Sequence, residues 1–180
     1  PIKSSAASDV YKRQYEKTVI ALLLKTLGLE RHNFFPTAGA AISPQVEEFM
    51  RSVGLLLVIG YGMTETTATV TLDRWDKPIT IGSVGRLLNG VQLKFGDNNE
   101  VLLKGDTITK GYYRKAEVTA LAIDEEGWFH TGDAGYMKNG ELFLTDRIKD
   151  LFKTSNGKFI APQMLESKLC VDRYCLLYTS

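Results

Sequence analysis

Apolar residues near the start of the chain recur at helical spacing. The residues that would share one face are Val19, Leu22, Leu23 and Leu27. This pattern predicts a helix over residues 15–27, and Gly28 is suited to end it because glycine readily adopts the left-handed conformation of a C-cap.

A second helix is predicted to begin at Ser43-Pro44, with serine as N-cap and proline in the first turn. Its apolar stripe consists of Val46, Phe49, Met50 and Val53, and Gly54 ends it. A short strand at 33–37 precedes this helix, and the apolar run 55–60 that follows reads as a buried strand. A strand–helix–strand unit of this kind favours an α/β layer that binds ligands at the carboxyl ends of its strands.

The pattern changes after residue 72, where short alternating segments replace helical periodicity. Strands are predicted at 91–95 and 100–104 around a turn at 96–99. Asn139-Gly140 predicts a tight hairpin between strands at 134–137 and 142–144, because both residues tolerate a positive φ.

A short helix is predicted at 116–123, and a further hairpin, with its turn at 155–157, joins strands at 151–153 and 159–160. Another helix begins at Pro162. The fold class is therefore α/β followed by a β-rich part, and a further piece starts after about residue 148.

The composition argues against a nucleic-acid-binding, membrane-spanning or disulfide-rich protein. Of 180 residues, 44% are hydrophobic, and Lys+Arg exceed Asp+Glu by only one, so no basic surface predicts nucleic acid as a partner. No apolar run reaches the roughly 18 residues of a membrane helix. Two cysteines are too few for a disulfide scaffold, which makes a cytoplasmic setting the default expectation.

The segment from Tyr61 to Glu65 (sequence YGMTE) carries the first chemical signal. Gly62 lets the backbone approach a base or phosphate, Thr64 can donate to a phosphate oxygen, and Glu65 can bind Mg²⁺. Alone, the Thr-Glu pair is equally typical of a helix N-terminus, where an acid complements the helix dipole.

Four segments in order give this motif its weight. They are Gly39-Ala40-Ala41, Tyr61 to Glu65, Gly127 to Asp133 (GWFHTGD) and Asp146 to Leu151 (DRIKDL). The series resembles the adenylate-forming superfamily of acyl-CoA synthetases, adenylation domains and luciferases. The stretch from Lys149 to Pro162 looks most like bacterial long-chain fatty acid–CoA ligases.

The resemblance implies the C-terminal half of a large adenylate-forming domain over residues 15–148, an α/β layer followed by a distorted β-barrel. It also implies the start of a small α+β domain over 149–169. The reaction that it implies has two steps. A fatty acid carboxylate attacks the α-phosphate of ATP to give acyl-AMP and pyrophosphate. The thiol of CoA then displaces AMP.

Site residues follow from the same resemblance. Gly39, Ala40 and Ala41 would flank adenine, and Tyr61 would stack on it, with Gly62 and Met63 completing the binding loop. Thr64 would hydrogen-bond phosphate.

The resemblance assigns catalytic roles to Thr64, Glu65 and Arg147. Glu65 would bind Mg²⁺, Asp133 would grip the ribose hydroxyls, and Arg147 would lie near ribose and phosphate. Lys149 matches the hinge about which the small domain rotates.

Plainer interpretations stay open for several of these residues. Asp133 alone could be a turn residue, and Arg147 and Lys149 could lie on a solvated strand face with acidic partners. His130 is expected to be structural, and Tyr112-Tyr113 are expected to pack the β-rich layer.

Two alternative functions remain. One is a fatty acyl-AMP ligase or carrier-protein adenylation domain. The other is a non-catalytic AMP-binding module.

Parts that the resemblance implies do not occur in this sequence. They are the Ser/Thr/Gly-rich phosphate loop, the upstream part of the acyl tunnel and the small-domain lysine that contacts the reacting carboxylate. Residues 1–14 and 170–180 match nothing expected and resemble translated adapter sequence, so we expect both ends to be non-native. The resemblance also implies peripheral membrane contact in the full-length protein, for which no anchor is visible in this sequence.

We therefore expect the chain alone to have no ligase activity. The measurement is pyrophosphate release from ATP in the presence of palmitate, compared with a Glu65→Ala control. Release above that control would contradict the expectation.

Overall fold

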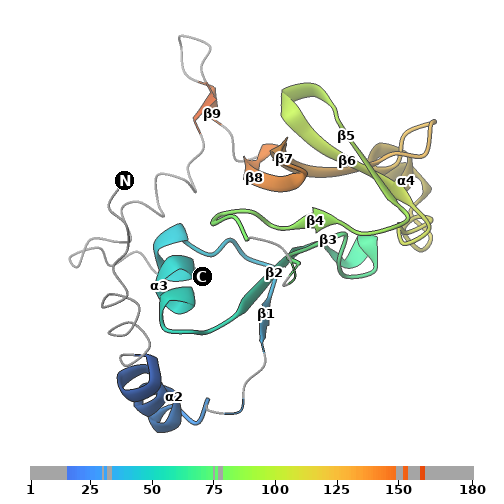
Figure 1. Ribbon diagram of the computed structural model, residues 1–180. Coiled ribbons are helices and arrows are strands. Elements are labelled where there is room, and N and C mark those ends of the chain that lie inside the picture. Colours follow the sequence, from blue (N-terminus) through green and yellow to red (C-terminus); the bar gives the residue numbers. More distant parts are fainter. Residues whose placement is uncertain are drawn as a thin grey trace.

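The chain contains two four-stranded sheets that pack against each other (Figure 1). The computed structural model describes residues 16–29, 31, 34–74, 76 and 79–148, together with the backbone of two short strands at 152–153 and 159–160. The predicted hinge residue Lys149, the predicted turn at 155–157, the helix predicted from Pro162, and both chain ends lie outside these residues.

The first sheet contains the predicted strand–helix–strand unit. It comprises β1 (Phe35–Thr37), α3 (Pro44–Ser52) and β2 (Leu57–Tyr61), and β1 and β2 are parallel. Ser43 caps α3 by accepting a hydrogen bond from the backbone N–H of Val46 at 3.3 Å, as predicted. Two antiparallel strands, β3 (Thr71–Leu72) and β4 (Arg86–Leu87), complete the sheet in the order β1-β2-β3-β4.

The predicted N-terminal helix begins with an irregular turn. Residues Glu16–Ile20 form a π-helical turn, η1, which continues into the α-helix α2 (Ala21–Thr26). The predicted helix is therefore present, with a π-helical first turn, and Gly28 follows it with a φ of 70°. The apolar stripe faces solvent, with Leu22 65% exposed, and Ile20 is the buried residue instead.

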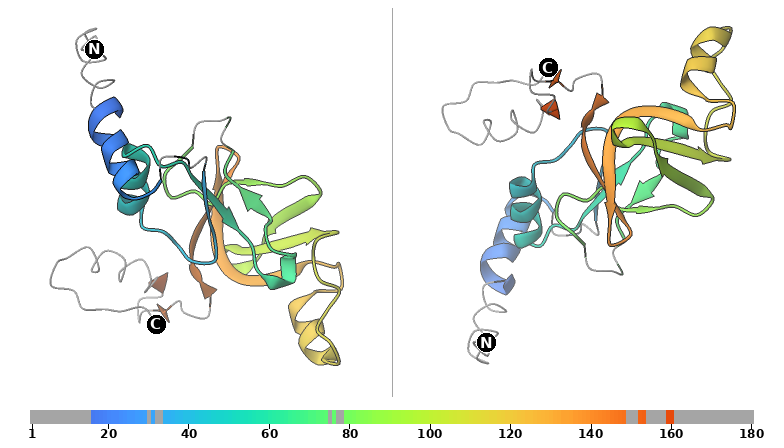
Figure 2. Two further views of the ribbon diagram at one scale, coloured as in Figure 1. Left: turned by 90° about the horizontal axis from the view of Figure 1, so that it is seen from below. Right: turned by 90° about the horizontal axis from the view of Figure 1, so that it is seen from above.

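The second sheet is an antiparallel meander of four strands, and it is curled (Figure 2). Its strands are β5 (Val91–Phe95), β6 (Glu100–Gly105), β7 (Phe129–Lys138) and β8 (Glu141–Arg147). The short 3-10 turn η3 (Asp97–Asn99) joins β5 to β6, and α4 (Ala116–Ala122) lies between β6 and β7. This confirms the predicted strands and helix.

The predicted Asn139-Gly140 hairpin is also present. Asn139 and Gly140, with φ of 54° and 78°, form the tight turn between β7 and β8. Beyond the meander, β9 (Phe152–Lys153) pairs antiparallel with β10 (Phe159–Ile160), as predicted.

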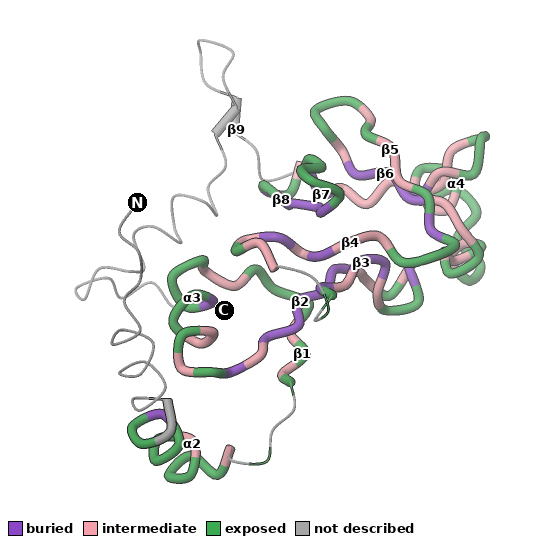
Figure 3. Tube along the Cα trace, viewed as in Figure 1, coloured by how far each residue is buried: buried purple, intermediate pink, exposed green. Residues whose placement is uncertain are grey.

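The hydrophobic core lies between the two sheets (Figure 3). Its buried members are Tyr61, Val70, Val91, Val101, Leu103 and Leu142. Backbone bonds also join the sheets, because Val84 N–H donates to the Leu142 carbonyl and Leu142 N–H donates to the Gly85 carbonyl. A β-carbon on Gly85 would lie 2.2 Å from the carbonyl carbon of Leu72, so only glycine fits this crossing.

A buried ionic network holds α3 against the first sheet. Glu47 is fully buried and accepts hydrogen bonds from Arg51 at 2.9 Å and from the backbone N–H of Gly82 at 2.8 Å. Arg51 also reaches Asp73 at 3.2 Å, and Asp73 accepts the N–H of Ile59 at 3.0 Å. Burial raises the pKa of Asp73 above its usual range, although the Ile59 N–H and the charge of Arg51 oppose that shift.

Among the described residues, no helix has the length and apolar character needed to cross a membrane.

We expect Glu47→Ala to lower the free energy of unfolding by about 2–3 kcal/mol, because it leaves the Gly82 N–H and part of the Arg51 charge without a partner. Urea unfolding followed by circular dichroism measures the loss. Glu48→Ala is the matched control, since Glu48 is the exposed neighbour on the same helix. Equal stability of the two variants would contradict the structural role of Glu47.

Candidate functional site

Two of the predicted binding segments lie at one edge of the first sheet. Residues 39–41 follow β1, and Tyr61 is the last residue of β2. Because β1 and β2 are parallel, their carboxyl ends meet at the same edge. Residues 39–41 are exposed there, and Gly39 has a φ of 86°.

Tyr61 links this edge to the second sheet. Its hydroxyl donates a 2.7 Å hydrogen bond to Oδ2 of Asp133 on β7, 72 residues away. Tyr61 is only 8% exposed, and burial, together with the negative charge of Asp133, raises its pKa strongly. The phenol therefore stays protonated and acts as a fixed donor that orients the carboxylate. Stacking of the Tyr61 ring on a base stays a prediction.

Arg147 lies directly across the strands from Asp133. The two residues are register partners on β7 and β8, and Nε of Arg147 lies 3.4 Å from Oδ1 of Asp133. The Arg147 side chain is 73% exposed, so the ion pair adds little stability and leaves most of the guanidinium free to meet an anion. Sequence reasoning predicted both residues, and the structure brings them together.

Glu100 shapes the bend that presents Asp133. Oε1 of Glu100 accepts the N–H of Gly132 at 3.0 Å, and Oε2 lies 3.0 Å from Nδ1 of His130. Gly132 adopts a φ of 72° at this bend, and the β6–β7 register shifts beside it. Sequence reasoning missed Glu100, because in the linear pattern it is one more polar residue at the start of a strand. The polar contact of His130 is with Glu100, on the strand beside it, which fits the expected structural role of this histidine.

The loop after β2 is built on close backbone contact. A β-carbon on Gly62 would lie 1.7 Å from the Ala68 carbonyl oxygen, so a side chain there would push the loop apart. The buried hydroxyl of Thr66 accepts the N–H of Met63 at 2.9 Å and closes the 3-10 turn η2 (Thr64–Thr66). Thr64 is exposed on this turn.

Glu65 is held by the segment 109–113, whose tyrosines were predicted to pack the β-rich layer. Tyr112 Oη donates to Oε1 of Glu65 at 2.8 Å, and the N–H of Thr109 donates to the Glu65 carbonyl at 2.7 Å. The hydrogen bond to Glu65 raises the pKa of Tyr112. The expectation that Tyr112 and Tyr113 both pack the β-rich layer is wrong, since Tyr113 is 83% exposed.

Glu65 offers one carboxylate to a cation whose other ligands are phosphate oxygens and water. The described residues contain no group of three or more His, Cys, Asp or Glu side chains able to hold a metal ion. Mg²⁺ is commonly bound by one or two carboxylates together with substrate phosphates and water. Glu65 therefore fits the predicted Mg²⁺ role as a single protein ligand, and that role stays a prediction.

The family of AMP-binding enzymes matches residues 6–113, which is more than half of the chain. The chain belongs to this family.

Two curated relatives are long-chain fatty acid–CoA ligases. One is the Mycobacterium bovis ligase FadD15, 35% identical over 134 residues. The match covers 74% of this chain and 22% of that protein. The other is long-chain fatty acid–CoA ligase 1 of Saccharomyces cerevisiae, 39% identical over 149 residues. That match covers 76% of this chain and 21% of the yeast protein. The chain thus spans about a fifth of the length of these relatives.

The fold also matches a solved relative. The O-succinylbenzoate coenzyme A synthetase of Bacillus subtilis, in complex with ATP and a magnesium ion, aligns with a TM-score of 0.66 and 26% identity. The match covers 90% of this chain and 38% of that one. It confirms the predicted fold class, an α/β layer followed by a β-rich part.

We expect Glu65→Gln to lower the pKa of Tyr112 toward its ordinary value. The raised value comes first from the bond to a charged carboxylate, and a neutral amide accepts that bond more weakly. This bond stabilises the fold below the ordinary tyrosine pKa and is lost as the pH rises through the raised one. Titration of the Tyr112 ring carbon by NMR measures the shift, and an unchanged midpoint in the variant would contradict the contact.

Proposed function

We propose that this chain is part of an ATP-dependent acyl-CoA ligase. In the proposed reaction, a carboxylate oxygen attacks the α-phosphorus of ATP, the bond to pyrophosphate breaks, and acyl-AMP forms. The sulfur of CoA then attacks the acyl carbon and AMP leaves. The observation that carries the proposal is the Asp133 carboxylate, held by the buried Tyr61 hydroxyl at the carboxyl edge of the first sheet.

The geometry of Asp133 suits a sugar diol. Tyr61 occupies Oδ2, while Oδ1 faces the exposed guanidinium of Arg147. A carboxylate is acceptor-only and has lone pairs left on both oxygens, so it can take two hydroxyl donors from ribose. Arg147 is then placed to meet the negative phosphate that adjoins the same sugar.

The loop after β2 supplies the phosphate side of the proposed site. Thr64 is exposed on η2, where its hydroxyl can donate to a phosphate oxygen, and Glu65 follows it. When bound, Mg²⁺ neutralises charge on the phosphates. Glu65 would hold that ion, and Thr64 would orient the phosphate beside it. The backbone contact at Gly62 fixes both residues relative to Tyr61.

We propose a long-chain fatty acid as the carboxylate and CoA as the thiol. Support comes from the two curated relatives, whose names give this substrate class, and from the sequence between Lys149 and Pro162. In the same proposal, residues 15–148 belong to the large domain, residues 149–169 begin the small domain, and Lys149 is the hinge.

Two alternatives use the same site. An acyl-AMP ligase or carrier-protein adenylation domain differs from the proposed ligase only in the thiol acceptor. Assays of a full-length relative that contains this segment, with CoA and with a carrier protein as acceptors, would distinguish the two functions. A non-catalytic AMP-binding module would bind AMP without supporting either step.

The proposal predicts that the chain binds AMP or a non-hydrolysable acyl-adenylate analogue through Asp133. We expect Asp133→Asn to weaken binding about tenfold, because a neutral amide loses the charge-assisted bonds to ribose yet still accepts from Tyr61. Ligand-observed NMR titration measures the affinity.

Asp97→Asn is the matched control, since it removes the same charge from an exposed turn. Equal weakening in both variants, or none in Asp133→Asn, would contradict a ribose contact.

A further inference from the structure

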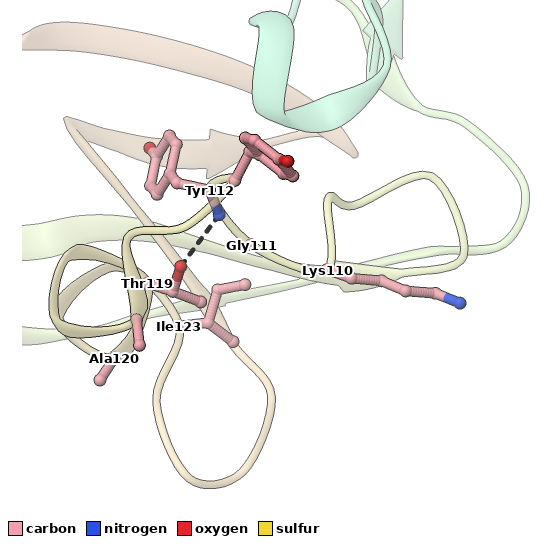
Figure 4. A pocket seen from close by; sticks show the side chains of 8 residues that line it. Lys110, Gly111, Tyr112, Thr119, Ala120 and Ile123 are labelled. Atoms are coloured by element: carbon pink, nitrogen blue, oxygen red, sulfur yellow. Dashed lines mark hydrogen bonds between the residues drawn. The ribbon is translucent and has the colours of Figure 1, made fainter.

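Residues 109–113 form a strap between β6 and α4, and both of its ends are tied down. At one end, the N–H of Thr109 donates to the Glu65 carbonyl at 2.7 Å. At the other end, the N–H of Tyr112 donates to the Thr119 hydroxyl on α4 at 2.9 Å (Figure 4). The strap also lines a hollow of about 600 Å³ beside α4.

The path of the strap leaves little freedom at its centre. Gly111 has a φ of 141°, and a β-carbon there would lie 2.6 Å from the Thr119 side chain. Its own N–H is bonded to the Thr109 hydroxyl at 3.3 Å. The backbone of Tyr112 is therefore placed by its neighbours and not by its own ring.

Because the backbone of Tyr112 is held in this way, its hydroxyl donates a hydrogen bond to one oxygen of Glu65. That oxygen is Oε1, at 2.8 Å from Tyr112 Oη. The described residues contribute no hydrogen bond to the second oxygen, Oε2. The carboxylate thus has one oxygen engaged by the protein and one available to a ligand.

This division matters for the choice of cation. Mg²⁺ demands a near-ideal octahedron at about 2.1 Å and takes a carboxylate through one oxygen. Ca²⁺ accepts longer contacts of about 2.4 Å and more ligands, and it commonly takes both oxygens of one carboxylate. Tyr112 uses one of the two lone pairs of Oε1, so the two-oxygen mode that suits Ca²⁺ competes with this hydrogen bond and is disfavoured without being blocked.

We propose that Tyr112 is a positioning residue that biases Glu65 toward binding a cation through one oxygen and thereby favours Mg²⁺ over Ca²⁺ at the nucleotide. The inference rests on the proposed function in one respect, namely that Glu65 holds the cation of bound ATP. Tyr112 itself touches neither cation nor nucleotide in this scheme and acts only through Glu65.

The test uses the full chain with Mn²⁺ and ATP as a paramagnetic probe. Bound Mn·ATP broadens the backbone amide signals around Glu65, and added Mg²⁺ or Ca²⁺ reverses the broadening. The ratio of the two concentrations needed for half reversal reports the cation preference. The preference of ATP itself is identical in every titration, so a change in the ratio between variants comes from the protein.

We expect Tyr112→Phe to shift this ratio toward Ca²⁺ by about fivefold, because a two-oxygen contact no longer competes with the hydrogen bond to Oε1. Tyr113→Phe is the matched control, since it removes an identical hydroxyl from an exposed neighbour and should leave the ratio unchanged. Should Tyr112→Phe fail to fold, Thr119→Val loosens the anchor while keeping both phenols, and it should shift the ratio in the same direction.

The possible failures are distinguishable. If Glu65→Gln abolishes the broadening while Tyr112→Phe keeps the original ratio, the inference about Tyr112 is overturned and Glu65 remains a ligand. If broadening is absent, or if it survives in Glu65→Gln, Glu65 is not the cation ligand, and both the inference and the metal part of the proposed function fall. AMP binding through Asp133 is measured separately and is not affected by either result.

Discussion

The hydrogen bond from Tyr61 to Asp133 joins the two four-stranded sheets, and with them the parts of the candidate site that each sheet carries. The Tyr61 ring belongs to the core between the sheets, so packing fixes where its hydroxyl lies. That hydroxyl is the donor that holds Asp133 on the opposite sheet. A change in how the sheets pack would move the carboxylate, which couples the stability of the core to the geometry of the site.

Around this bond, backbone contacts place the remaining groups. Gly62 allows the loop after β2 to fold back onto Ala68, and Thr109 on the strap binds the carbonyl of Glu65. Glu100 serves the same purpose on the second sheet, where it holds the bend at Gly132. The groups proposed to meet ribose, phosphate and metal are thus held by neighbours that need not touch the nucleotide. Such supporting contacts limit side-chain motion before a ligand arrives.

Sequence reasoning reached much of this arrangement. The order of motifs identified the family, and local patterns located α3, α4, the meander strands and the Asn139-Gly140 hairpin, since caps, turns and strand alternation act over a few residues. It located the N-terminal helix but not its surroundings, since the apolar stripe containing Leu22 is exposed. Periodicity shows that apolar residues share a face, but it cannot show what covers that face.

The sequence by itself determined the family, the order of the elements and the chemical identity of the groups at Tyr61, Glu65, Asp133 and Arg147. Only the tertiary structure decided that Tyr61 donates to Asp133, that Glu100 supports the bend beside it, and that Tyr112 engages Glu65. The physical reason is distance along the chain. Tyr112 and Glu65 are separated by 47 residues and Tyr61 and Asp133 by 72, so these contacts depend on how the sheets and the strap pack. No local pattern of residues encodes them.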